Sequence, residues 1–414
     1  MDNGGLKAAT VGDRLEPLQL TVDRLRPLWR RTSPPWLRTS PLSRLSVLAL
    51  LGFAVARILN LIEFAGIARF TKGHTLGSVL VSWDGRWYLK IAHHGYPSAL
   101  QYGPDGHVRQ SALAFFPLYP ALVGGIGRMT QLPFGIIAVG ISLICGSFAA
   151  IGIVWLLEPR LGGGTALTAS LIWSNWVSAP VMAMAYSEAL FTAEIVAILL
   201  LLLRRRYGWV AALLPLAALT RGSFPPLVAV LAVHAVMVLH GTERGRRLRA
   251  LRWPGALVAW GALWTPVWPL YVGWRVGQAD AYVSEQRAWK HDYSPLASWG
   301  RAIGRFGDGH SMMNDVIVLV VLMAAVLAVT GLFTRLDWEL KVLAPVALLY
   351  LMTVLEPTAS FLRFLLPFVT VPAVLATWLR SWAARIGVIV LLAVTQLWWI
   401  RAFLVTSSTW HPSL

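Results

Sequence analysis

The chain has 414 residues, of which 57% are hydrophobic and only 13% are charged, and its mean hydropathy is +0.61. Ordinary soluble domains carry roughly twice that share of charge, so the composition excludes them and predicts an all-α polytopic integral membrane protein. The net charge of +17 comes from arginines clustered beside apolar runs, which is typical of cytoplasmic loops and not of nucleic-acid binding. The one cysteine, Cys145, excludes a disulfide framework.

The first 41 residues carry arginines and prolines without a periodic apolar face. They are expected to form a basic cytoplasmic tail, with one surface helix around residues 18–29. The apolar run that begins at Leu42 starts too far from the terminus and continues too long for a cleavable signal. Residues 42–414 are expected to form a single transmembrane domain.

Eleven apolar runs are long enough to span a bilayer, some of them only beside partner helices. They cover residues 45–62, 133–157, 165–181, 187–203, 208–220, 225–240, 253–274, 315–333, 341–356, 361–379 and 386–405. A twelfth run, 113–129, contains Pro117, Pro120 and three glycines. Broken backbone at membrane depth needs protein or water around it, so this run is expected to be a re-entrant or juxtamembrane helix.

The arginine clusters in the tail and at 204–206, 244–252 and 380–385 all reach the cytoplasm only if run 113–129 does not span. The expected topology then has a cytoplasmic N-terminus and an extracytoplasmic C-terminus. Two long extracytoplasmic loops, 63–132 and 275–314, emerge on the outer face together with three turns, near 186–188, 221–223 and 356–363. Charged groups at a membrane edge are costly and tend to be functional, so this face is the expected site.

Residues 82–97 form a charged, aromatic island in the first loop. Trp83, Trp87, Ile91 and His94 share one helical face, which predicts a helix lying flat at the membrane surface, with Asp84, Arg86 and Lys90 pointing elsewhere. The sequence Gly95-Tyr96-Pro97 is expected to end it.

Asp84 lies among aromatic residues on which a sugar ring can stack, and partial desolvation there favours a carboxylate that acts as a base. The alternative is that Asp84 pairs with Arg86 or caps its own helix. Glu188 either orients a substrate or is a first-turn acid favoured by the helix dipole. Arg221 and Arg363 either hold an anionic leaving group or extend to the interface. The adjacent His93 and His94 are a poor metal pair, so no metal site is expected.

Four motifs in order resemble those of the PIG-V-type mannosyltransferases, which are membrane glycosyltransferases of the GT-C fold. They are Ser82-Trp83-Asp84-Gly85-Arg86-Trp87-Tyr88 with Gly95-Tyr96-Pro97, Ala114-Phe115-Phe116-Pro117-Leu118-Tyr119-Pro120, Tyr186-Ser187-Glu188-Ala189-Leu190-Phe191 and Ala218-Leu219-Thr220-Arg221. The resemblance covers roughly residues 40–370. Two positions differ from the usual pattern of this family, His93 after Ile91-Ala92, and Gly222-Ser223 after the motif arginine.

The resemblance implies inverting transfer of a hexose, usually mannose, from a polyprenyl-phosphate carrier to a glycolipid or lipid-linked acceptor on the outer face, without a cofactor. It also implies that Asp84 is the general base. The expected substrate-binding residues are Trp83, Arg86, Trp87, Tyr88, His93, His94, Tyr96, Tyr119, Tyr186, Glu188, Arg221 and Arg363.

The expected protein is therefore a monomeric, multi-pass enzyme of the bacterial plasma membrane that contacts membrane lipids, its lipid-linked donor and its glycolipid acceptor. Loop 275–314 contains the run Trp289-Lys290-His291-Asp292-Tyr293, which either covers the site or belongs to an interfacial aromatic belt. Two other functions stay open, a lipid or solute transporter or flippase of the cell envelope, and a non-catalytic scaffold of a glycan-assembly complex. Transporters commonly contain repeated halves with interrupted helices, and no such repeat is evident in this sequence.

Overall fold

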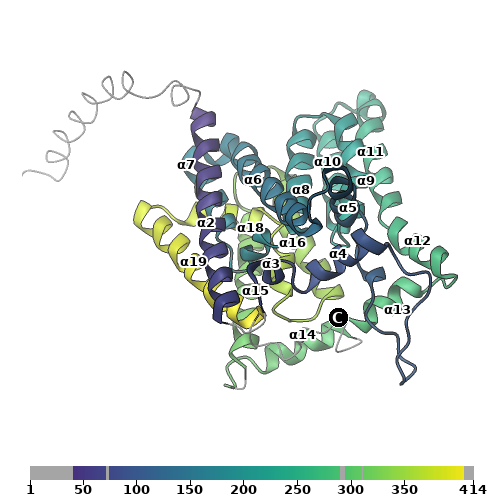
Figure 1. Cartoon of the computed structure of the whole chain (residues 1–414). Coiled ribbons are helices and arrows are strands. Elements are labelled where there is room, and N and C mark those ends of the chain that lie inside the picture. Colours follow the sequence, from purple (N-terminus) through teal and green to yellow (C-terminus); the bar gives the residue numbers. More distant parts are fainter. Residues whose placement is uncertain (1–40, 71–73, 290–293, 310, 405–414) are drawn as a thin grey trace, which may run out of the picture. The chain divides into compact units, whose positions relative to one another are not determined.

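The computed structural model describes residues 41–70, 74–289, 294–309 and 311–404. Throughout these residues the regular structure is helical, apart from one isolated bridge between Tyr102 and Val108, which confirms the all-α prediction for the described part of the chain (Figure 1). The basic tail, apart from its last residue, and the surface helix expected at 18–29 lie outside the described residues.

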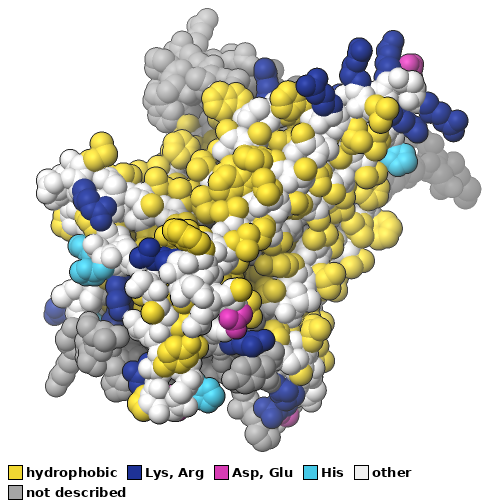
Figure 2. Space-filling model, turned by 90° about the vertical axis from the view of Figure 1, so that its right-hand side faces the viewer, with side chains coloured by type: hydrophobic (Ala, Val, Ile, Leu, Met, Phe, Trp, Pro, Cys, Tyr) yellow, Lys and Arg dark blue, Asp and Glu magenta, His cyan; other side chains and the backbone are white. Residues whose placement is uncertain are grey.

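Four of the described helices are long and apolar enough to cross a membrane. They are α2 (Pro41–Phe70), α6 (Phe134–Leu161), α15 (Met312–Gly331) and α19 (Trp382–Leu404). Many large apolar side chains on them are exposed. Figure 2 shows an apolar band across one face of the molecule, with Lys and Arg side chains at its upper right end and also below it and to its left. These features support an integral membrane protein, while the number of eleven spans stays a prediction.

Several shorter apolar helices pack against the long ones. Helices α8 (Glu188–Leu203) and α9 (Tyr207–Thr220) form a pair, as do α10 (Pro225–His240) and α16 (Trp338–Val354). Helix α6 contacts both α7 (Gly163–Ser174) and α8, and α7 also contacts α18 (Thr370–Trp378) (Figure 1).

Three of the predicted apolar runs, 165–181, 253–274 and 361–379, are not continuous helices in the structure. Each run covers two elements, which are α7 with η4 (Ala179–Ala183), α11 (Arg247–Trp264) with α12 (Val267–Val276), and α17 (Phe361–Phe364) with α18. Pro266 and Pro367 lie in the interruptions, and Pro180 lies just after one, at the second position of η4. Proline has no N–H to donate and disfavours helical backbone at the preceding residue.

The first loop consists of α3 (Leu76–Leu80), α4 (Asp84–His94), η3 (Ala112–Ala114) and α5 (Leu118–Thr130). Run 113–129 therefore forms a short turn and a 13-residue helix that packs on α4 and α6. A helix of that length covers about 20 Å, less than the roughly 30 Å of a bilayer core. This length supports a re-entrant or juxtamembrane role for α5.

The second loop contains α13 (Ala281–Ala288) and α14 (Pro295–Gly304). Glu285 of α13 is fully buried and accepts hydrogen bonds from the backbone N–H and the hydroxyl of Ser111, at 2.5 and 2.9 Å. The two loops are thereby joined at the start of η3. Residues 290–293 of the predicted covering run lie outside the described residues.

Polar contacts at the two ends of α8, α9, α10 and α16 show which ends of these helices lie together. Arg221, just after α9, pairs with Glu188 at the start of α8. At the opposite ends, His234 of α10 bonds Glu339 at the start of α16 and Tyr207 at the start of α9, at 2.6 and 3.1 Å. The basic runs 204–206 and 244–252, the latter including η5 (Arg244–Arg246), therefore follow helix ends opposite to Glu188. Along α8 the separation is about 24 Å.

Candidate active site

Helix α4 carries the predicted base at its first position. Trp83 precedes it with φ 56° and ψ −119°, a backbone conformation that costs energy in a residue with a Cβ. Gly95 ends the helix with a φ of 73°, which glycine adopts without that cost.

The face of α4 that is buried differs from the expected one. Its buried residues are Gly85, Tyr88, Ile91 and Ala92, whereas His94 is exposed and Trp87 is half-buried. The prediction that Asp84 points away from the packed side is therefore wrong. The reason is that α4 packs against α5, η3 and α6. These protein contacts, and not the flat lipid surface that was expected, determine which face of α4 is buried.

Asp84 belongs to a cluster of four charged side chains from four parts of the chain. The Arg363 guanidinium donates from Nη1 to Asp84 Oδ2 at 2.5 Å and to Glu188 Oε1 at 3.1 Å. Arg221 Nη1 lies 3.0 Å from Glu188 Oε2 as an ion pair, and donates to the Ser187 hydroxyl at 3.0 Å. The cluster thus contains two carboxylates and two guanidinium groups, and its formal charge is zero.

The members of this charge cluster differ in their access to solvent. The Glu188 side chain is fully buried, and those of Arg221 and Arg363 are 6% and 8% exposed. The Asp84 side chain is 16% exposed, so it is the most accessible of the four. A substrate hydroxyl therefore reaches Asp84 more easily than Glu188.

Aromatic side chains surround the charge cluster. The Tyr88 hydroxyl is 2.8 Å from the Ser187 hydroxyl, and the Tyr119 ring packs edge-on against Tyr88 with centroids 4.9 Å apart. The Arg363 guanidinium lies over the Tyr186 ring at 5.2 Å, and Phe364 contacts both guanidinium groups at 4.5 and 5.1 Å. These rings limit water around the ion pairs, which strengthens the electrostatic contacts.

The structure therefore brings seven of the expected site residues together: Asp84, Tyr88, Tyr119, Tyr186, Glu188, Arg221 and Arg363. Arg86, His93 and His94 lie outside this group on exposed parts of α4, and His93 stacks on Phe134 of α6 at 4.1 Å. Sequence reasoning missed Ser187, although its place beside Glu188 in the same turn was an available signal. It also missed Glu285, for which the loop sequence offers no periodic pattern.

Trp87 and Tyr96 line a separate hollow at the C-terminal half of α4. Its volume is about 200 Å³, and its lining includes Lys90, His94 and Gln101. Trp87 stacks on Phe115 at 6.0 Å, and the Lys90 ammonium lies over the Trp87 ring at 5.2 Å. Lys90 was not among the expected site residues. We call this space the α4 hollow.

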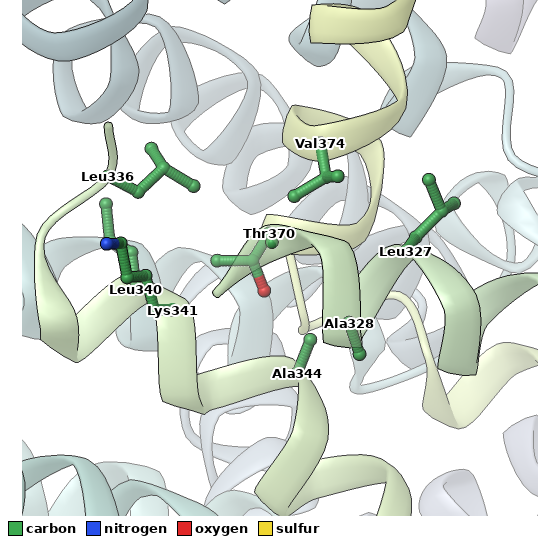
Figure 3. A pocket seen from close by; sticks show the side chains of 9 residues that line it. Leu327, Ala328, Leu336, Leu340, Lys341, Ala344, Thr370 and Val374 are labelled. Carbon is green, nitrogen blue, oxygen red and sulfur yellow. The ribbon is translucent and has the colours of Figure 1, made fainter. Parts of the chain in front are cut away.

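A second gap lies between α15, α16 and α18 (Figure 3). Its lining is apolar except for Thr370 and Lys341, and it is too narrow to hold a water molecule. Among the described residues, no group of three or more His, Cys, Asp or Glu side chains is placed to hold a metal ion.

Comparisons of the chain with known protein families and with characterised proteins find no match. The family assignment therefore stays a prediction based on the four motifs.

Proposed function

We propose that the chain is a polyprenyl-phosphate-sugar-dependent glycosyltransferase of the GT-C fold, which transfers a hexose, expected to be mannose, to a glycolipid acceptor. The observation that supports it best is the charge cluster, in which Asp84 is the accessible carboxylate. The cluster lies at helix ends opposite to the basic runs at 204–206 and 244–252. By the preference of such runs for the cytoplasm, it faces the outside of a bacterial plasma membrane.

The proposed reaction uses Asp84 as general base. The Asp84 carboxylate accepts the proton of an acceptor hydroxyl while that oxygen attacks the anomeric carbon of the donor sugar. The bond from the anomeric carbon to the phosphate oxygen breaks, and the phosphate leaves on the opposite face with the electron pair. A base of this kind contributes about 10²–10⁴-fold to the rate.

The buried members of the cluster are positioning residues in this scheme. Arg363 orients Asp84 through the 2.5 Å bond, and Glu188 holds Arg363 from the other side. Arg221 and Ser187 secure Glu188 and Tyr88 in turn. The sequence-based proposal that Arg221 or Arg363 binds the donor phosphate requires one of them to leave its carboxylate.

The alternative function, transport or flipping of a lipid or solute, is favoured by ionisable groups buried within helices. Glu194 of α8 is 7% exposed and accepts a hydrogen bond from Thr220, and Arg57 of α2 is 2% exposed. Arg57, however, donates to the carbonyl oxygens of Ser174 and Ala179, where it caps the end of α7. The main charge cluster lies at helix ends, which favours a surface reaction over a path through the midplane.

The test is transfer of radiolabelled mannose from polyprenyl-phosphate mannose by the purified protein, with a lipid extract of its own membrane as acceptor. We expect Asp84→Asn to lose at least 100-fold in rate while the protein folds normally. The matched control is Asp337→Asn, because Asp337 also pairs with an arginine, Arg160, at the opposite helix ends. An Asp84→Asn protein within a few-fold of wild type excludes Asp84 as the base.

A further inference from the structure

The charge cluster has no surplus positive charge to offer a phosphate. Arg221 and Arg363 are balanced by Glu188 and Asp84, and both guanidinium groups are less than a tenth exposed. Releasing either arginine leaves a buried carboxylate without its partner, which costs about 3–5 kcal/mol in comparable buried pairs. A lipid-linked phosphate is therefore bound more easily by a cation that is not already committed to a carboxylate.

The α4 hollow lies beside this cluster along the same helix. Trp87, Lys90 and His94 follow Asp84 by three, six and ten residues, which places them about 4.5, 9 and 15 Å further along the helix axis. With about 100° per residue, all three point about 60–120° to one side of Asp84. The hollow therefore lies on the neighbouring face of α4, further along the helix than Asp84.

The charges around the α4 hollow favour an anion. Among the described residues that line it, none is acidic, and Lys90 and His94 are both exposed. Arg275 adds a further positive charge, because it donates to the carbonyl oxygens of Tyr96 and Pro97 in the lining, at 2.7 and 3.0 Å.

The buried acid Glu285 contacts the wall of the α4 hollow through Ser111. Glu285 accepts hydrogen bonds from the Ser111 N–H, the Ser111 hydroxyl and the Trp289 indole, the last at 3.3 Å. Ser111 separates Glu285 from the α4 hollow, since Ser111 itself is a lining residue. Glu285 is thus placed to hold the wall of the hollow in position.

We propose that the α4 hollow binds the phosphate group of a membrane lipid through Lys90, with His94 and the Trp87 ring beside it. On the basis of the proposed function, we assign this phosphate to the polyprenyl carrier. Asp84 does not line the hollow, so the donor sugar would have to span the axial separation of about 9 Å between Lys90 and Asp84.

The test is equilibrium binding of radiolabelled decaprenyl phosphate to the full-length protein in phosphatidylcholine nanodiscs. We expect Lys90→Met to weaken binding about tenfold, as for loss of one charged hydrogen bond, and Lys90→Arg to retain most of it. The matched control is Lys341→Met, because the Lys341 ammonium also lies over a tryptophan, Trp338, at 4.6 Å. Lys341 lines the apolar gap at the opposite helix ends (Figure 3).

Three outcomes decide the proposal. If only Lys90→Met loses decaprenyl phosphate binding and phosphatidylglycerol does not compete for the site, the carrier phosphate is the ligand. If phosphatidylglycerol competes equally well, a phospholipid headgroup is the source of the phosphate. Unchanged binding by Lys90→Met, or an equal loss in Lys341→Met, overturns the site. Binding is measured without turnover, so this test does not depend on the proposed function. If decaprenyl phosphate binding depends on Lys90 but the protein shows no transferase activity, only the proposed function is refuted. In an active enzyme, Lys90→Met raises the donor KM more than it lowers kcat.

Discussion

Removing the positive charge of Arg363 is expected to destabilise the protein strongly. Arg363 is 8% exposed and contacts Asp84 and Glu188 together, and Arg363→Met keeps a long side chain while it leaves both carboxylates without this cation. Truncating one partner of a buried ion pair costs about 3–5 kcal/mol. Because Asp84 is partly exposed and Glu188 retains Arg221, we expect a cost near the lower limit, about 3 kcal/mol.

The matched control is Arg160→Met. Arg160 also makes an arginine–aspartate pair, with Asp337 at 2.7 Å, but the two side chains are 49% and 22% exposed. Exposed pairs of this kind contribute about 0–1 kcal/mol. The two variants thus compare one chemical change at a buried and at an exposed position.

The assay is reversible unfolding in mixed micelles with increasing dodecyl sulfate, followed by helical circular dichroism. The double variant Arg363→Met/Asp84→Asn should recover part of the loss, because the unpaired carboxylate is then neutral, and contacting residues commonly show coupling of about 0.5–3 kcal/mol. Equal costs for Arg363→Met and Arg160→Met, or strict additivity in the double variant, would refute the buried bridging role of Arg363.

Two further measurements test the loops that frame the site. Burial raises the pKa of Glu285 above its usual 4.5, although hydrogen bonds from Ser111 and Trp289 act in the opposite direction. Folding therefore favours the protonated form of Glu285. In thermal unfolding, the stability of wild type relative to Glu285→Gln should fall as the pH rises from 4.5 through the raised pKa. A stability difference that does not change with pH contradicts this prediction. The second measurement concerns Trp83, whose φ is 56°. Trp83→Gly should be about 1 kcal/mol more stable than Trp83→Ala, because only alanine keeps the backbone strain. The reverse order of denaturation midpoints would contradict that explanation.

Apolar periodicity and arginine placement were sufficient to predict a helical chain and to select Asp84, Glu188, Arg221 and Arg363 as residues of one region. Both signals depend on neighbours within a few positions or on a count of charges per loop. Hydropathy was less reliable where proline interrupts an apolar run, as at Pro266 and Pro367, because the average over a run does not detect a missing N–H.

The pairing within the charge cluster required the tertiary structure. Asp84 meets Arg363 across 279 positions of the chain and Glu188 meets the same arginine across 175, separations about which local pattern carries no information. The buried face of α4 was decided in the same way, because α5, η3 and α6 pack on it and override the face that a lipid surface would select.

Residue types and their local order therefore specified the helices, the membrane-like surface and the chemical groups available at one end of them. Only the packing decided that two arginines are balanced by two carboxylates, and that Lys90 lies in a separate hollow beside them. The physical reason is that net charge and helix periodicity are properties of segments. Ion pairs and hollows depend on distances between segments, which the fold alone sets.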